Sequence, residues 1–298
     1  MCFMGRFFII GNGFDLHHNL PTSFSRFKNY VKEKSQKDFE QITSFFSDTC
    51  QIGADFFWSN IEDSLVNVTN FDMEDAFADV ENSVETDIDK TSYWHDYQYI
   101  SSCSFPLLDR LRVFFDEWVD GLDSGITNTK PDDRIHFTEN DLFLNFNYTS
   151  TLQRLYGVST KQILYLHGKI GDRKVFGHDL QPHLLGFRGD DFRIEEAIGI
   201  LNCKQTQFFK NSEANIEKNK SFFDCIPQFH EVVFMGWSLG YQDEAYMRKI
   251  LSLISDSMKI TVVYLGSTTK KRFESFLENY GCKNRCVYIE WNEIDGFL

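Results

Sequence analysis

Residues 6–24 read RFFIIGNGFDLHHNLPTSF, and this stretch decides the fold. Four consecutive apolar residues, Phe7 to Ile10, lead directly into Gly11-Asn12-Gly13, and Asp15 follows. A short apolar run without alternation that ends in a glycine turn is typical of a strand buried on both faces of a parallel sheet. The stretch therefore predicts the first strand of an α/β fold, with small and polar residues at its carboxyl end.

Similar apolar runs return only late in the chain. After the first strand, roughly a hundred residues carry apolar side chains at helical spacing, as in FPLLDRLRVFFDEWVDGL, residues 105–122. Further strands are then predicted at 142–146, 162–167, 231–236, 259–266 and 286–291. Alternating strands and helices indicate a parallel sheet covered on both faces. We expect a core built from residues 1–20, 140–180 and 230–298, a helical insertion over 21–135, and a small insertion or lid over 180–230.

Composition narrows the class of protein. The 298 residues carry a net charge of −14, which disfavours nucleic acid as a partner because phosphate binding needs clustered Lys and Arg. The opening apolar run of four residues is too short for a membrane span or a signal sequence. The seven cysteines are odd in number. Together these features predict a cytoplasmic protein with free thiols and no membrane partner.

Polar and small residues follow several predicted strands at the point where each strand ends. In an open parallel sheet, ligands bind beyond the carboxyl ends of the strands, so these residues are the candidate ligand contacts. They are Gly11, Asn12, Gly13 and Asp15 after the first strand, Asn147 and Tyr148 after the second, His167 and Gly168 after the third, His178 and Asp179 in a following short run, and Gly236, Ser238 and Asp243 after the strand at 231–236.

The glycine turn has two interpretations. Glycines let the backbone approach a phosphate, and free N–H groups at a helix start favour anions. The same pattern serves any tight turn, and Leu16 stands where the full dinucleotide fingerprint has a third glycine. Asp15 suits a contact with a ribose hydroxyl, an orienting role, or the N-cap of a helix.

The histidines differ in the roles that their positions in the sequence favour. His167 ends an apolar strand and precedes a glycine, which favours a general base or a substrate contact. His178 and Asp179 form either a hydrogen-bonded pair or two unrelated neighbours. His17 and His18 adjoin each other, so they point apart on any regular element and are expected at the surface.

Two other chemistries are disfavoured. No two histidines show the helical spacing that binds zinc, so no metal is expected. GWSLG, residues 236–240, matches the Gly-x-Ser-x-Gly turn of serine hydrolases. That class places its catalytic histidine after the serine, and the last histidine here is His230.

Three motifs combine into a resemblance. FFIIGNGFDLHHNLPTSF (7–24), FLNFNYTSTLQRLYG (143–157) with LYLHGKIGD and VFGHD, and VVFMGWSLGYQDEAYM (232–247) resemble the AbiH-type abortive-infection proteins of bacteria. More distantly they are similar to sirtuin-like antiphage domains that cleave NAD. The resemblance implies a Rossmann-like, sirtuin-like parallel sheet with a large helical insertion after the first strand.

The more distant resemblance also implies roles for residues. Asn147 contacts the nicotinamide ribose, His167 assists catalysis, and Ser238 touches the adenosine ribose. Two positions depart from the pattern: Asn12 stands where alanine is usual, and Thr149 replaces an aspartate. The paired zinc cysteines of deacetylating sirtuins are missing from the sequence, so protein deacylation is disfavoured.

These expectations combine into an antiphage, nucleotide-binding hydrolase that cleaves NAD, or a related nucleotide, at the nicotinamide–ribose bond. Asn147, His167 and Asp15 are the expected catalytic residues, and the remaining strand-end residues bind the nucleotide. A homo-oligomer and a phage-derived trigger or partner protein remain open. Two alternatives also remain open: a nucleotide sensor without activity, and a nuclease that acts during phage infection.

Overall fold

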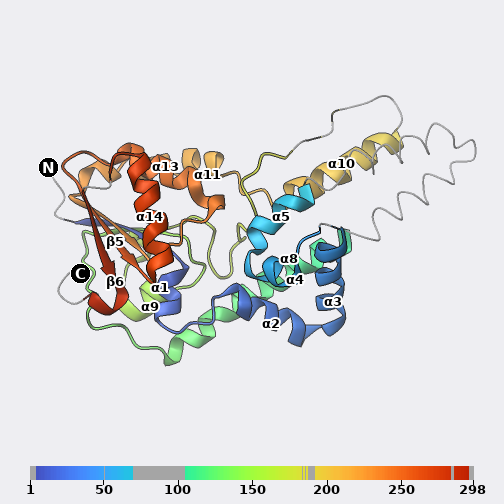
Figure 1. The fold of residues 1–298 in the computed structure, drawn as a ribbon, viewed down its shortest axis with the longest axis horizontal. Coiled ribbons are helices and arrows are strands. Elements are labelled where there is room, and N and C mark those ends of the chain that lie inside the picture. Colours follow the sequence, from blue (N-terminus) through green and yellow to red (C-terminus); the bar gives the residue numbers. More distant parts are fainter. Residues whose placement is uncertain are drawn as a thin grey trace, which may run out of the picture. The chain divides into compact units, whose positions relative to one another are not determined.

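The computed structural model describes residues 5–49, 51–69, 105–182, 184, 186, 192–282 and 285–294 (Figure 1). The chain divides into two compact units. The first, here called the sheet unit, comprises Met1–Ser23, Val119–Val175 and Asn211–Leu298. The second, here called the helical unit, comprises Phe24–Trp118 and Phe176–Lys210. No helix among the described residues is both long enough and apolar enough to cross a membrane.

Among the described residues, the sheet unit contains six strands, and every pairing between them is parallel. The strands are β1 (Arg6–Ile10), β2 (Leu142–Asn145), β3 (Ile163–Tyr165), β4 (Glu231–Met235), β5 (Lys259–Tyr264) and β6 (Cys286–Glu290). Their order is β3-β2-β1-β4-β5-β6. This is the order of the doubly wound Rossmann sheet, in which the direction of winding reverses between β1 and β4. The predicted α/β class and parallel sheet are confirmed.

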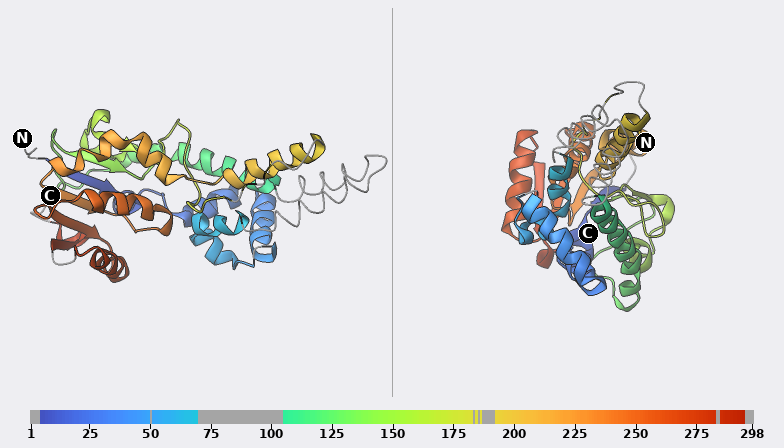
Figure 2. Two further views of the ribbon diagram at one scale, coloured as in Figure 1. Left: turned by 90° about the horizontal axis from the view of Figure 1, so that it is seen from above. Right: turned by 90° about the vertical axis from the view of Figure 1, so that its right-hand side faces the viewer.

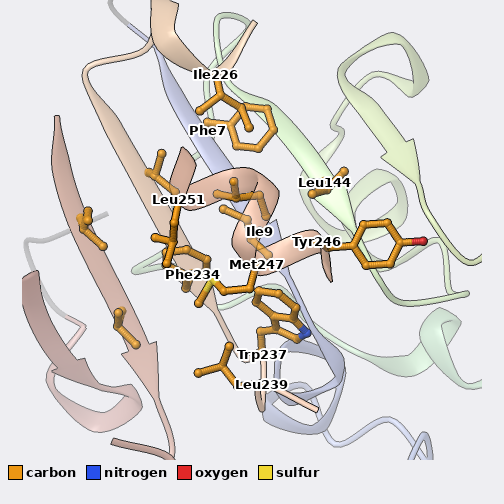
Figure 3. Close-up of a cluster of buried hydrophobic side chains, with 14 of the residues drawn as sticks. Phe7, Ile9, Leu144, Ile226, Phe234, Trp237, Leu239, Tyr246, Met247 and Leu251 are labelled. Atoms are coloured by element: carbon orange, nitrogen blue, oxygen red, sulfur yellow. The ribbon is translucent and has the colours of Figure 1, made fainter. Parts of the chain in front are cut away.

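Side chains of β1 alternate between two cores, as successive residues of a strand must. Phe7 and Ile9 pack into a cluster with α13 (Glu244–Leu253; Figure 3) and α14 (Ser267–Asn279), whereas Phe8 and Ile10 pack into a cluster on the opposite face with α1 (Asn12–His17) and α9 (Thr151–Tyr156). All four are fully buried. The absence of alternation in FFII therefore reflects a strand covered on both faces, and β1 lies at the centre of the sheet.

The connections of the sheet unit supply the covering helices (Figure 2). They are α1 (Asn12–His17), η2 (Asp123–Asn128), α9 (Thr151–Tyr156), η3 (Thr160–Gln162), α11 (Ser212–Lys218), α12 (Lys220–Phe223), η4 (Ile226–Gln228), η5 (Tyr241–Asp243), α13 (Glu244–Leu253), α14 (Ser267–Asn279) and η7 (Trp291–Glu293).

The helical unit is held together by aromatic rings. Phe115 stacks on Phe176 with ring centroids 3.8 Å apart, and Phe27 meets the edge of Trp58 at 6.2 Å. Its elements are α2 (Phe24–Lys34), α3 (Gln36–Ser44), the π-helical turn η1 (Phe45–Thr49), α4 (Ala54–Ser59), α5 (Ile61–Thr69), α10 (Phe192–Thr206) and α8 (Phe105–Leu122) as far as Trp118. Residues 70–104 of the expected insertion lie outside the described residues.

The unit boundaries differ from the expected insertion at 180–230. Residues 176–210 belong to the helical unit, whereas residues from Asn211 onward belong to the sheet unit. Phe223, Ile226 and Phe229 explain the second assignment, because all three are buried in the core that covers β1 and β4. The segment is polar overall, so its sequence did not indicate that these three apolar residues belong to the core.

Candidate functional site

The glycine turn after β1 interlocks with the turn after β4. Gly13 N–H donates to the carbonyl of Gly236 at 2.7 Å, and Gly11 N–H donates to Met235 at 3.0 Å. A Cβ on Gly13 would lie 2.7 Å from the Gly236 oxygen. Gly236 has φ of +67°, and a Cβ there would collide with the backbone nitrogen of Phe14. The glycines thus allow two backbones to touch, and two N–H groups of the turn are bonded within the protein.

Asp15 lies directly beyond this turn and is buried, with 1% of its surface exposed. The Thr149 hydroxyl donates to Asp15 Oδ2 at 2.6 Å, and the Thr151 hydroxyl donates to Oδ1 at 2.7 Å. Asp15 is in the first turn of α1, whose N-cap is Gly11, so Asp15 is not the N-cap. Its carboxylate instead joins the connection after β1 to the connection after β2.

Burial shifts the pKa of this carboxyl group. Removal from water raises the pKa of Asp15 from its ordinary value of 3.8 to about 6, because the charged form is desolvated. Hydrogen bonds from Thr149, Thr151 and the Asn147 side chain lower the pKa and offset part of this rise. The group therefore changes charge in the range where an acid or base works near neutral pH.

Asn147 and His167 lie at the carboxyl ends of neighbouring strands. β2 and β3 pair with Asn145 opposite Tyr165, and Asn147 and His167 each follow two residues later. Both are buried, with 6% and 5% exposed. The Asn147 amide donates through Nδ2 to the carbonyl of Gly11 at 3.1 Å. The two residues therefore stand at the same edge as the glycine turn.

His167 faces a carboxylate. Its Nε2 lies 3.4 Å from Asp243 Oδ1, an ion-pair distance. The atom nevertheless makes no hydrogen bond to a described residue, because the alignment with Asp243 is poor. Asp243 ends η5, the turn that precedes α13. The arrangement brings an imidazole from β3 and a carboxylate from the β4 connection together, as expected for residues at strand ends.

The remaining predicted contacts in the sheet unit have varied surroundings. Asn12 is exposed and donates through its amide to Thr22 O at 3.0 Å. The Tyr148 hydroxyl donates to Val175 O at 2.7 Å, and its ring lies 6.2 Å from that of His167. Gly168 has φ of +81°, with the Arg173 carbonyl where a Cβ would stand. Ser238 is exposed, and its carbonyl accepts from Arg272 at 2.8 Å.

His178 and Asp179 belong to the helical unit. His178 is fully buried and its main chain bonds Phe208 and Lys210, each at 2.8 Å. Burial lowers the pKa of His178 to about 4, so its ring is neutral at physiological pH. Their predicted contact with a nucleotide stays a prediction.

The expectation that both adjacent histidines lie at the surface is wrong for His18. Its ring is 5% exposed, Nδ1 donates to Phe14 O at 2.7 Å, and Nε2 accepts from the Tyr156 hydroxyl at 2.7 Å. Burial lowers the pKa of His18. His17 is half-buried, stacks on Trp291 with centroids 4.2 Å apart, and bonds Asp132 at 2.8 Å.

Two residues at this edge escaped the sequence-based prediction. Thr151 was not among the predicted site residues, yet its hydroxyl closes the Asp15 network. Trp237 was not among them either, and its indole nitrogen is buried without a hydrogen-bond partner among the described residues. Among those same residues, no group of three or more His, Cys, Asp or Glu side chains has the arrangement of a metal site.

Comparison with known proteins gives the family. A family model described as bacteriophage abortive infection AbiH matches residues 7–264, from the second residue of β1 to the last residue of β5. The chain belongs to the AbiH family. Membership supports a role in abortive infection, the defence by which bacteria limit phage. No curated protein and no solved structure matches the chain. The AbiH match covers the glycine turn, the Asp15 network and the His167–Asp243 pair.

Proposed function

We propose that this AbiH protein is a nucleotide-binding hydrolase that cleaves NAD at the bond between nicotinamide and ribose. One observation carries the proposal: Asn147, His167 and Asp243 come from three different strand connections and stand at the carboxyl edge of a β3-β2-β1-β4-β5-β6 sheet. In sheets of this order, nucleotides bind where the winding reverses, between β1 and β4. The likeness to other Rossmann sheets supports the ligand class by analogy.

Three groups have suitable chemistry for hydrolysis. Water attacks the anomeric carbon, the bond to the pyridine nitrogen breaks, and nicotinamide leaves as a neutral molecule with that electron pair. His167 accepts the proton that the water loses, and the Asp243 carboxylate stabilises the resulting imidazolium. Asn147 orients the ribose or the water through its carboxamide. No metal takes part in these steps.

Asp15 has a different role in this proposal. Both of its oxygens already accept hydrogen bonds from threonine hydroxyls, and only 1% of its surface is exposed. We therefore assign Asp15 to positioning: it holds Thr149, and with it the neighbouring Asn147, against the first strand. The nucleotide contacts predicted for Asn12, Gly13 and Ser238 remain part of the proposal.

The test is incubation of the pure protein with millimolar NAD, with and without phage lysate, followed by chromatography for nicotinamide and ADP-ribose. We expect release of both products. The His167→Asn variant should lose about 10²- to 10⁴-fold in rate, as is usual when a general base is removed. His230→Asn is the matched control, because His230 is an exposed histidine at the opposite, amino end of β4, and it should keep full activity.

Two results would reject the proposal. One is the absence of nicotinamide under every condition, and the other is an equal rate in the wild type and His167→Asn. Calorimetry on the same samples separates the remaining cases. Tight binding of NAD or ADP-ribose without turnover would assign the protein as a nucleotide sensor, whereas digestion of nucleic acid with Mg²⁺ would assign it as a nuclease.

A further inference from the structure

The indole of Trp237 is buried in the aromatic core at the end of β4. Only 4% of the residue is exposed, and the ring stacks on Phe146 and on Phe234 with centroids 4.6 Å and 6.0 Å away. In Figure 3 its nitrogen points away from the Leu239 side chain. An indole N–H only donates, and this one has no acceptor among the described residues. Buried donors are normally paired, because an unpaired one costs about 1–3 kcal/mol.

Trp237 stands beside the first strand at the point where the winding reverses. A Cβ on Gly11 would lie 2.5 Å from the Trp237 Cα, so the two backbones are in close contact. The carbonyl of Gly11 also accepts the Asn147 amide at 3.1 Å. The backbone of Trp237 thus lies against the strand end to which the amide of Asn147, the residue proposed to orient ribose, is hydrogen-bonded.

Phe146 connects the indole to the proposed base. Its ring stacks on Trp237 and receives the edge of His167, with centroids 5.3 Å apart. His167 Nε2 is the second buried ring nitrogen here that lacks a hydrogen-bond partner among the described residues. One aromatic ring therefore separates two unpartnered nitrogens, and the Asp243 carboxylate lies 3.4 Å from one of them.

We infer that Trp237 is a sugar-binding residue, whose indole N–H donates to a hydroxyl of the ribose that carries nicotinamide. A sugar hydroxyl suits this position, because it accepts from the indole and can also donate to an imidazole or a carboxylate. A phosphate suits the position less well, because the Asp243 carboxylate repels an anion. The identity of the sugar rests on the proposed function, whereas the missing acceptor of the Trp237 indole is a property of the described structure.

The test uses the indole N–H signals in proton–nitrogen NMR spectra of the full-length protein. The chain has five tryptophans, and the signal missing from Trp237→Phe identifies Trp237. We expect this signal to move downfield on addition of ADP-ribose, but not on addition of ADP, which lacks the second ribose. Calorimetry should show that Trp237→Phe binds ADP-ribose about tenfold more weakly, the loss expected for one buried hydrogen bond.

Trp291→Phe is the matched control. Trp291 is also 4% exposed and its indole nitrogen also lacks a partner among the described residues, but it follows the edge strand β6. Its signal and the affinity of its variant should not change. The inference is overturned if the Trp237 signal stays fixed while other signals report bound ADP-ribose, if ADP moves it equally, or if no ADP-ribose binds at millimolar concentration.

This design separates the inference from the proposed hydrolysis. A Trp237 signal that responds to ADP-ribose in a protein that releases no nicotinamide would support the sugar site and reject the reaction. Release of nicotinamide at equal rate and equal KM by the wild type and Trp237→Phe, with an unmoved indole signal, would support the reaction and reject the sugar site.

Discussion

Two polar clusters lie at the carboxyl edge of the same sheet, and they differ in how well their atoms are bonded. In the first, both oxygens of Asp15 accept threonine hydroxyls at 2.6 Å and 2.7 Å. In the second, Trp237 Nε1 and His167 Nε2 are equally buried yet lack hydrogen-bond partners among the described residues. A closed network stabilises a fold, whereas an open one costs stability until something fills it. The comparison separates buried polar groups that are satisfied within the fold from those for which we propose a ligand.

The largest effect should come from the glycine contact that brings both clusters to one edge. Gly236→Ala places a Cβ against the backbone nitrogen of Phe14, at a φ of +67°. Backbone strain and overpacking each cost about 1–3 kcal/mol, so we expect a loss of roughly 3–5 kcal/mol in the free energy of unfolding. Urea denaturation of the purified protein measures this loss.

Gly121→Ala is the control for this substitution. Gly121 lies in α8, and a Cβ there would meet no atom within 4 Å. Alanine is the better helix former by about 1 kcal/mol, so this variant should be slightly more stable than the wild type. Equal stability of Gly236→Ala and wild type would show that the two turns do not touch as described.

The next effect concerns the charge of Asp15. Burial raises the pKa of this carboxyl group from 3.8 to about 6, so between these values the folded protein holds a proton that the unfolded chain has lost. The stability contributed by the protonated group is present below pH ~4 and is lost as pH rises through about 6. The wild type should therefore lose about 2–3 kcal/mol between pH 4 and 7 relative to Asp15→Asn, which does not titrate.

Denaturant unfolding of both proteins at these two pH values gives this difference. The exposed Asp224 supplies the control, because Asp224→Asn removes a carboxyl group that folding does not bury. The prediction is contradicted if the difference in unfolding free energy between the wild type and Asp15→Asn stays constant, or moves in favour of the wild type as pH rises. Either result would mean that folding does not remove the Asp15 carboxylate from water.

The strands and the edge that carries the site were predictable from local patterns. FFII and EVVFM show no alternation because both faces of β1 and β4 are covered, and glycine follows each of them. The parallel order then places all strand ends together, which is why Asn147, His167 and Asp243 could be singled out without coordinates.

The closure of the Asp15 network was not predictable in this way. It needs two connections, from β1 and from β2, to meet at atomic distance, and the sequence separation of 134 residues between Asp15 and Thr149 hides that meeting. Trp237 was missed for another reason: an aromatic residue in an apolar context predicts core packing, and only coordinates show whether its N–H has an acceptor. His178 fell in the other unit because a short run of sequence carries no sign of which unit it joins.

The smallest effect gives the sharpest form of the comparison, because it applies one substitution to both kinds of hydroxyl. Thr151 and Thr22 are both buried in the sheet unit, with 2% and 9% exposed. The Thr151 hydroxyl donates to Asp15, whereas the Thr22 hydroxyl has no hydrogen-bond partner among the described residues. Valine keeps the branched shape of threonine, so the substitution removes the hydroxyl and little else.

We expect Thr151→Val to lower the free energy of unfolding by about 1–2 kcal/mol, since Asp15 loses a donor. Thr22→Val should be neutral or stabilising by up to about 1 kcal/mol. Thermal or urea unfolding of the two variants at pH 7 measures both values. Equal losses of stability would mean that the Thr22 hydroxyl finds a hydrogen-bond partner in solution. The absence of a described partner would then no longer show that a buried group is unpaired, and this would apply to the Trp237 indole as well.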